Sequence, residues 1–219
     1  MWKTLKQKFL NLFWPKQCIN CGKEGKYLCD DCFALIDILR DPPIRNLKYI
    51  NGIHYAVSYQ EKLIKTAIHL YKYKRIKGLS EVMVSLIIAH LKLSNKLETL
   101  NNGMLCAIPL HKTKLKKRGF NQAEEIAKEL AKSLNLPFVP NALIKTKKTP
   151  AQMTLNKKER KQNIVDCFKI NPKIRKQIIN KKIFLIDDVL TTGATMQECA
   201  RILKQNKASE VWGIVVARD

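Results

Sequence analysis

The sequence has no apolar run long enough to carry the chain into or across a membrane. Nothing in it approaches the roughly 20 apolar residues of a transmembrane helix. Lysines interrupt residues 1–15, where a secretory signal peptide needs an unbroken apolar core. The seven cysteines are an odd number, and four of them form two Cys-x-x-Cys pairs, which argues against a secreted protein held by disulfides. We therefore expect a cytoplasmic protein in a reducing compartment.

Acidic residues are also scarce. The 219 residues include 18 aspartates and glutamates against 41 lysines and arginines, which gives a formal net charge of +23. Such a surface attracts polyanions, nucleic acid first and anionic membrane surfaces second; a solvated lysine-rich surface without a partner is the alternative. Hydrophobic residues make up 46% of the chain, enough for the core of one α/β domain with a small appendage.

The glycine-rich loops of common nucleotide-binding folds, Gly-x-Gly-x-x-Gly and Gly-x4-Gly-Lys-Ser/Thr, are missing too. In their place stands the run Ile183–Thr195: an apolar segment typical of a buried parallel strand, two aspartates, a Thr/Gly loop and the start of an amphipathic helix. Amides at a helix N-terminus suit a phosphate, whereas carboxylates suit ribose hydroxyls or waters on Mg²⁺. The run predicts a site for a phosphorylated ribose, formed by Asp187, Asp188, Val189, Leu190, Thr191, Thr192, Gly193, Ala194 and Thr195.

Four cysteines near the N-terminus have the spacing Cys-x2-Cys-x7-Cys-x2-Cys. Each pair can form a tight turn that directs two thiolates at one centre, and two such turns complete the tetrahedron of sulfurs that structural Zn²⁺ prefers. A redox dithiol pair and an iron–sulfur centre are the alternatives. We expect the remaining cysteines to be small buried residues. The spacing favours a structural zinc knuckle whose ligands are Cys18, Cys21, Cys29 and Cys32.

Strand and helix patterns alternate along the rest of the chain, which predicts an α/β fold with a mostly parallel sheet. Asp41-Pro42-Pro43 ends a helix expected over 33–39 and divides a knuckle region, 1–43, from a main domain, 44–219. Residues 1–15 predict a short helix, either docked on the protein or lying on a membrane surface. The expected strands are 53–59, 104–109, 167–170, 183–187 and 210–217, and the expected helices are 62–74, 79–93, 122–134 and 195–205.

The run Ile183–Thr195 resembles the 5-phosphoribosyl-1-pyrophosphate (PRPP) signature of the type I phosphoribosyltransferases. The resemblance implies that fold, a PRPP site and Mg²⁺. Negative charge builds on the departing pyrophosphate, so amides and cationic side chains must meet it. Residues 108–122 leave a strand with five cations and no acid, which predicts a pyrophosphate loop that includes His111, Lys112, Arg118 and Gly119. Residues 145–152, followed by Arg160 and Asn163, lie where the type I enzymes place a flexible lid, so the resemblance implies a lid that includes Gln152.

Taken together, these segments resemble the ComF family, cytosolic phosphoribosyltransferase-like components of natural transformation, over nearly the whole chain. The resemblance implies a protein that helps incoming single-stranded DNA through the cytoplasm. It also implies a competence helicase or the inner-membrane DNA-uptake machinery as partners, with peripheral contact at the inner face of the membrane. The segments that carry it are the four-cysteine knuckle, Leu70-Tyr71-Lys72-Tyr73, Ile108-Pro109-Leu110-His111, Arg118-Gly119-Phe120-Asn121-Gln122, Thr149-Pro150-Ala151-Gln152, Arg160-x-x-Asn163 and Asp187–Thr195.

These patterns leave three functions open. The one we favour is a competence protein that binds single-stranded DNA and keeps a PRPP site; Tyr71, Tyr73 and Phe120 are candidate stacking faces. The second is a metabolic phosphoribosyltransferase that uses a base or an amine as acceptor, for which the sequence shows no acceptor pocket. The third is a PRPP sensor whose ligand alters DNA affinity. No residue is assigned as catalytic. The candidate DNA-binding residues are Lys112, Lys114, Lys116, Lys117, Lys145, Lys147 and Lys148.

Overall fold

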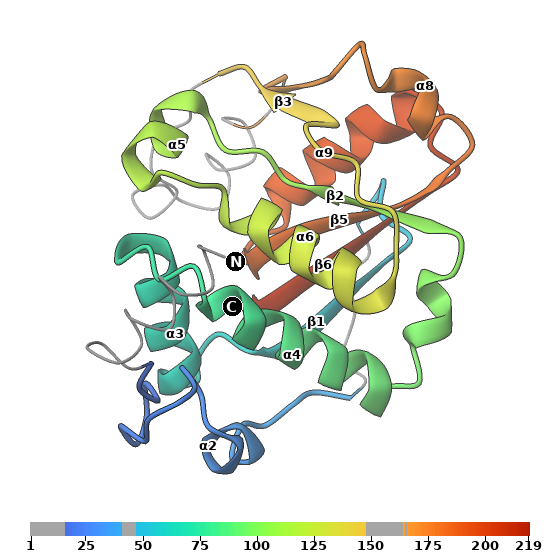
Figure 1. The fold of residues 1–219 in the computed structure, drawn as a ribbon. Helices are drawn as coiled ribbons and strands as arrows, with labels where there is room; N and C mark the ends of the chain where they lie inside the picture. The colour runs from blue at the N-terminus through green and yellow to red at the C-terminus, as the bar shows by residue number, and fades with distance from the viewer. Residues whose placement is uncertain (1–15, 41–46, 148–163, 165) are drawn as a thin grey trace, which may run out of the picture.

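A parallel sheet of four strands, in the order β1-β6-β5-β2, forms the centre of the molecule (Figure 1). The computed structural model describes residues 16–40, 47–147, 164 and 166–219. Neighbouring strands of this sheet all run parallel, so their carboxyl ends meet at one edge. The strands are β1 Gly52–Ser58, β2 Gly103–Ala107, β5 Lys182–Leu190 and β6 Glu210–Arg218.

Both faces of the sheet are buried, because side chains of the central strands alternate between two apolar clusters. Phe184 and Ile186 of β5 belong to one cluster, and Ile183 and Leu185 belong to the other. All four side chains are fully buried. The apolar run that predicted a buried parallel strand is therefore a strand covered on both sides.

Helices cover both faces of the sheet (Figure 1). Helices α4 and α6 pack on one face, and α9 packs on the other. Helix α3 joins the α4–α6 side through Ile64, Ile68 and Tyr71, which are all buried. The helices are α2 Asp30–Ala34, α3 Lys62–Tyr73, α4 Leu79–Leu93, the 3₁₀ helix η1 Leu97–Leu100, α5 Lys112–Arg118, α6 Gln122–Leu134, α8 Arg175–Ile178 and α9 Ala194–Gln205.

The observed elements differ from the predicted ones mainly around the segments predicted to bind phosphate. Residues 112–118, which were expected to belong to a pyrophosphate loop, form the helix α5. This helix has no buried residue, so its sequence lacks the apolar periodicity that predicts a helix. Strand β5 runs beyond its predicted end to Leu190, because β6 pairs with it throughout. The predicted strand at 167–170 does not enter the main sheet. It is β4 Phe168–Ile170, which pairs antiparallel with β3 Leu143–Lys145 in a separate two-stranded sheet.

The helix expected after the knuckle also lies earlier than predicted. Helix α2 starts at Asp30, inside the four-cysteine segment, with Cys29 as its N-cap. Asp30 and Asp31 occupy its first turn, where carboxylates interact favourably with the helix dipole. The second cysteine pair is therefore held by a helix N-terminus.

The knuckle region packs against the start of α4. Leu28 and Ile36 are buried in the same cluster as Leu79. The ring of Tyr27 lies against Gly78, where an added Cβ would come within 2.5 Å of it. The two predicted regions thus share a core, and their division at residue 43, which lies outside the described residues, stays a prediction.

In the described part of the chain, no helix has both the length and the apolar character needed to span a bilayer. The helix predicted at 1–15 and most of the predicted lid lie outside the described residues.

Candidate functional site

The acidic pair lies where β5 loses one of its two neighbouring strands. Strand β2 pairs with β5 only as far as Ala107 and Ile186, after which the chain turns into α5. Strand β6 continues to pair with β5 from Asp187 to Leu190. Ligands of open α/β sheets bind at the carboxyl ends of strands where neighbouring connections diverge. Asp187 and Asp188 occupy that position.

The side chains of the two aspartates point to opposite faces of β5, as successive side chains of a strand do. Asp188 forms a 2.8 Å ion pair with Lys72 of α3, on the side covered by α4 and α6. Asp187 lines a hollow of about 30 Å³ together with residues 191–193 and the first turn of α9. The two carboxylates therefore have different surroundings.

The hollow beside Asp187 has the features of a phosphate cradle. Gly193 has a φ of +76°, in the left-handed region that favours glycine, and a Cβ there would lie 3.1 Å from Leu47. Helix α9 begins directly after it, and the amide of Ala194 donates to the Thr192 hydroxyl at 3.4 Å. Amides at the N-terminus of a 12-residue helix favour an anion. The structure thus assembles the residues predicted to hold a phosphate.

Cationic side chains approach the carboxylates from α5 and β3 as well as from α3. Besides Lys72, these are Lys114 and Arg118 of α5 and Lys145 of β3, which interact electrostatically with one another or with Asp187. Burial lowers the pKa of Lys145, and the charge of Lys114 lowers it further. Burial likewise lowers the pKa of Lys114, and Arg118 adds to that effect. Crowded cations of this kind favour a multiply charged anion.

Asp187 and Lys72 both have raised pKa values, but for different reasons. Burial raises the pKa of Asp187 to about 7, and repulsion by Asp188 acts in the same direction. Burial would lower the pKa of Lys72, but the charge and hydrogen bond of Asp188 outweigh it and raise that pKa. At neutral pH, Lys72 is therefore charged, and Asp187 changes its protonation state easily.

The segment after α5 is a turn whose polar residues have structural partners. Gly119, with a φ of +81°, ends α5. Arg118 donates to the side-chain oxygen of the buried Gln122 at 2.9 Å, and the side chain of Asn121 donates to the Ile108 carbonyl at 3.0 Å. These bonds attach α5 to the end of β2 and the start of α6, and so fix the position of its cations.

His111 caps α5. Its Nδ1 accepts a hydrogen bond from the Thr113 amide at 3.3 Å and lies 2.9 Å from the Thr113 hydroxyl. Capping explains the residue without a catalytic role. Its membership of a pyrophosphate site, like that of Lys112, Arg118 and Gly119, stays a prediction.

The predicted DNA-binding lysines separate into two groups. Lys114 and Lys145 are half-buried and belong to the cation group described above. Lys148, like the lid residue Gln152, lies outside the described residues. The exposed group comprises Lys112, Lys116, Lys117 and Lys147.

The three predicted stacking faces differ in exposure. Tyr71 and Phe120 are buried and pack on each other, with ring centroids 5.3 Å apart. Tyr73 is 54% exposed, and the guanidinium of Arg118 lies 5.4 Å from its ring centroid. Of the three, Tyr73 is the one available to a base.

Lys72 contacts the candidate site, although no role for it was predicted from the sequence. It continues the spacing of the buried Ile64 and Ile68 on α3, so it extends the apolar face of the helix toward Asp188. The signal available in the sequence was a lysine at a position of the apolar face. Its contact with Asp188 could not be predicted, because the two residues lie far apart in the chain.

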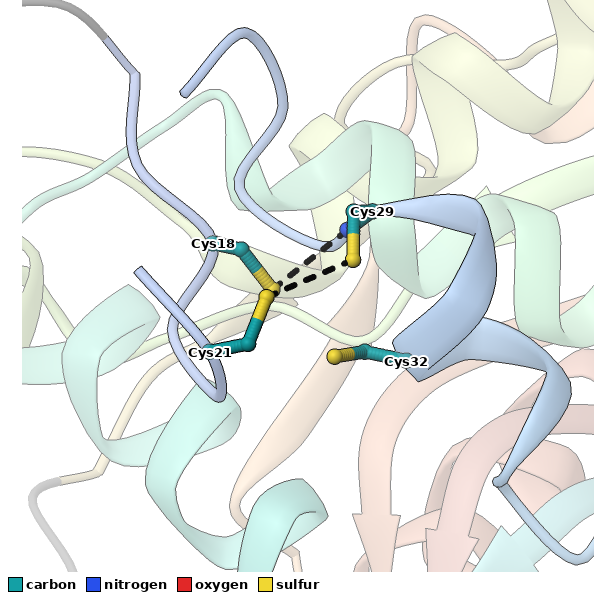
Figure 2. Close-up of side chains that lie close together, drawn as sticks. All are labelled: Cys18, Cys21, Cys29 and Cys32. Carbon is teal, nitrogen blue, oxygen red and sulfur yellow. Dashed lines mark hydrogen bonds between the residues drawn. The ribbon is translucent and has the colours of Figure 1, made fainter. Parts of the chain in front are cut away.

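The four N-terminal cysteines converge on one point (Figure 2). Their Sγ atoms all lie within 4.8 Å of one another. The Sγ atoms of Cys21 and Cys29 are 3.6 Å apart, and ligands on a tetrahedral zinc with bonds of about 2.3 Å are about 3.8 Å apart. The four sulfurs could hold Zn²⁺, and four protein ligands would leave no open position for a substrate.

Backbone amides favour the thiolate of Cys18 in this cluster. Burial would raise its pKa, but hydrogen bonds from the amides of Cys21, Cys29 and Asn20 outweigh burial and lower the pKa to about 6. The Asn20 side chain also donates to the Cys32 sulfur at 3.3 Å. Deprotonated sulfur is the form that binds metal.

We expect purified protein to contain one Zn²⁺ per chain and the Cys18→Ser variant to lose it, because three thiolates cannot complete the tetrahedron. Mass-spectrometric metal analysis combined with thermal unfolding should show loss of zinc and a lower Tm. Cys106→Ala, at a buried cysteine outside the cluster, should keep its zinc. Full zinc content in Cys18→Ser would contradict the knuckle.

Asp187 predicts a specific dependence of stability on pH. Because its folded pKa is raised from 3.8 to about 7, its stabilising contribution is complete below about pH 4 and is lost as pH rises through about 7. Between pH 5 and pH 8, wild type should lose about 1 kcal/mol or more of unfolding free energy relative to Asp187→Asn, measured by denaturant titration. The exposed Asp37→Asn is the control. Parallel pH profiles for wild type and Asp187→Asn would rule out the raised pKa.

Comparisons with known proteins add to this geometry. The phosphoribosyl transferase domain family matches residues 115–219. Competence protein F of Haemophilus influenzae is 25% identical over 203 residues, which cover 91% of this chain and 84% of that protein. Competence protein ComFC of Streptococcus pneumoniae is 26% identical over 198 residues, 90% of this chain and 78% of that protein. DNA utilization protein YhgH of Escherichia coli is 29% identical over 110 residues, 49% of this chain and 47% of that protein.

The matches to the two competence proteins extend well beyond the phosphoribosyl transferase domain. The fold fits the domain match, since a parallel sheet flanked by helices carries the Asp187–Thr195 segment, and a four-cysteine cluster lies N-terminal to that sheet. This is the predicted type I phosphoribosyltransferase fold with a zinc knuckle. Together, the domain match, the full-length similarity to the competence proteins and the fold support a phosphoribosyltransferase-like protein of the ComF family.

Proposed function

We propose that this protein binds PRPP with Mg²⁺ at the carboxyl end of β5 and binds single-stranded DNA on the adjacent basic surface. One observation carries the proposal: the N-terminus of α9 and the Asp187 carboxylate line the same hollow, and Lys145 of β3 interacts electrostatically with that carboxylate. A 5-phosphate, a ribose and a pyrophosphate need these three kinds of partner.

Each part of the ligand has a matching group on the chain. The amides of residues 191–194 would bind the 5-phosphate, and Asp187 would accept hydrogen bonds from ribose hydroxyls. Those bonds favour the ionised carboxylate and so lower its raised pKa. Lys114, Lys145 and Arg118 would face the pyrophosphate. Mg²⁺ would neutralise further phosphate charge and keep most of its water ligands.

The DNA part of the proposal is supported by charge and exposure. Lys112, Lys116 and Lys117 are exposed on α5, and the net charge is +23. Tyr73 offers an exposed ring next to this helix. Single-stranded DNA binds to such combinations through backbone charge and base stacking. The names of the relatives, which refer to competence and DNA utilization, support the same role.

The cations facing the pyrophosphate position also favour a second candidate, a phosphoribosyltransferase that transfers ribose 5-phosphate to a base or an amine. Stabilising the leaving group is the main demand of that reaction. Pyrophosphate release that depends on an added base or amine would support this candidate, and its absence across a broad panel would exclude it.

The PRPP site can be tested by calorimetric titration of PRPP and Mg²⁺ into wild type and the Asp187→Asn/Asp188→Asn variant. We expect the variant to bind at least about tenfold more weakly, because each lost charged hydrogen bond costs about 1.5–3 kcal/mol. The matched control is Asp30→Asn/Asp31→Asn, an adjacent pair of exposed aspartates in α2. Equal affinities for wild type and the β5 variant would refute the site.

Repeating that titration with single-stranded DNA present separates two roles of PRPP. A regulator requires PRPP and DNA to change each other's affinity by the same factor. Independent affinities would leave PRPP as a ligand or substrate without control over DNA binding.

DNA binding predicts a salt dependence that falls when α5 is neutralised. We expect Lys116→Gln/Lys117→Gln to weaken binding of a labelled oligothymidylate and to reduce the slope of log affinity against log salt by about 1.4, since each lost phosphate contact contributes about 0.7. Lys92→Gln/Lys132→Gln removes the same charge at exposed positions near the ends of α4 and α6. Equal slopes for the two variants would contradict a DNA path along α5.

A further inference from the structure

Lys72 has an uncommon position for a lysine. It lies on the stripe of α3 that buries Ile64 and Ile68, and its side chain is 18% exposed. Its Nζ is 2.8 Å from an Asp188 carboxylate oxygen, and the Asp188 side chain is 9% exposed. This ion pair is therefore largely buried at the end of β5.

We propose that Lys72 is the resident cation of the phosphoribosyl site: it pairs with the Asp188 carboxylate in the absence of ligand, leaves it when a divalent cation takes its place or when phosphates of the ligand attract it, and then faces those phosphates. This inference rests on the PRPP site proposed above. It assigns a role to a residue of α3, outside the segment that matches the phosphoribosyl transferase domain.

The surroundings of the pair favour an exchange of partners. A buried carboxylate without a partner is strongly unfavourable, so Asp188 needs a cation when no ligand is bound. The Arg118 charge repels Lys72, whereas Asp188 and Asp187 attract it. The flexible stem of a lysine allows its ammonium group to move between nearby anions. An incoming phosphate offers such an anion.

The position of the pair links it to ligand binding rather than to core stability alone. Asp188 immediately follows Asp187, and its amide donates to an Asp187 carboxylate oxygen at 2.9 Å. Asp187 in turn lines the hollow with residues 191–196. A change at Asp188 is thus one residue from the phosphate cradle.

Competition between Lys72 and a divalent cation has two measurable consequences of opposite sign. In Lys72→Met, Mn²⁺ alone should bind about fivefold more tightly, because the ammonium group that competes for Asp188 is gone, an effect at the upper end of the range for ion pairs that solvent still reaches. Pyrophosphate alone, without metal, should bind about fivefold more weakly, because one cation of the site is missing. A merely structural role would weaken both or change neither.

The experiment uses the zinc-loaded chain of residues 1–219, with Mn²⁺ followed by electron paramagnetic resonance and pyrophosphate by calorimetry. Lys62→Met, an exposed lysine at the other end of α3, is the matched control and should behave as wild type. Unchanged Mn²⁺ affinity in Lys72→Met, including no detectable binding in either protein, would overturn the proposal. Weaker binding of both ions would overturn it as well.

Because removing Lys72 leaves a buried charge unpaired, the Asp188→Asn/Lys72→Met double variant serves as a second test. Neither partner is charged in this variant, so it should fold even where the single variant is unstable. The proposal expects Lys72→Met to have no effect on Mn²⁺ affinity in the Asp188→Asn background. An equal gain in both backgrounds would contradict competition at Asp188.

The outcomes also separate this inference from the proposed function. Opposite changes for Mn²⁺ and pyrophosphate, with no PRPP binding to wild type, would support the resident cation and remove the PRPP function. PRPP binding by wild type, with no opposite changes in Lys72→Met, would do the reverse.

Discussion

Two adjacent carboxylates at the end of a buried parallel strand need compensation for their charge, and the rest of the site is arranged around that need. Strand β5 brings Asp187 and Asp188 to a position where one neighbouring strand has already turned away. Helix α3 supplies Lys72, α5 supplies Lys114 and β3 supplies Lys145. Segments far apart in the chain thus meet through electrostatics at one edge of the sheet.

The alternation of side chains along β5 gives the two carboxylates different tasks. Asp188 faces α3 and is held in an ion pair, whereas Asp187 faces the start of α9 and lines the hollow proposed to bind a phosphate. Burial raises the pKa of Asp187 to about 7, so its charge depends on what binds beside it. One strand therefore separates a carboxylate held in an ion pair from one whose charge can change.

The features that the sequence predicted well are those encoded locally. The apolar run of β5, the loop before α9 and the paired cysteines each lie within a few residues, and all appear as expected. Helix α5 was not predicted, because it buries no side chain and is defined by its caps, His111 and Gly119. Strands β3 and β4 are too short for their pattern to tell the main sheet from a separate ribbon. Lys72 needed its contact with Asp188, which only the fold creates.

The strand order has a consequence for dissecting the protein. The segment recognisable as a phosphoribosyl transferase domain, 115–219, contains β5 and β6, the two central strands. Both edge strands, β1 and β2, precede it in the chain and flank the pair on either side. A fragment cut at the start of this match would expose two unpaired strand edges, a template for aggregation. The segment that matches the domain family is therefore smaller than the sheet in which both central strands have neighbours on each side.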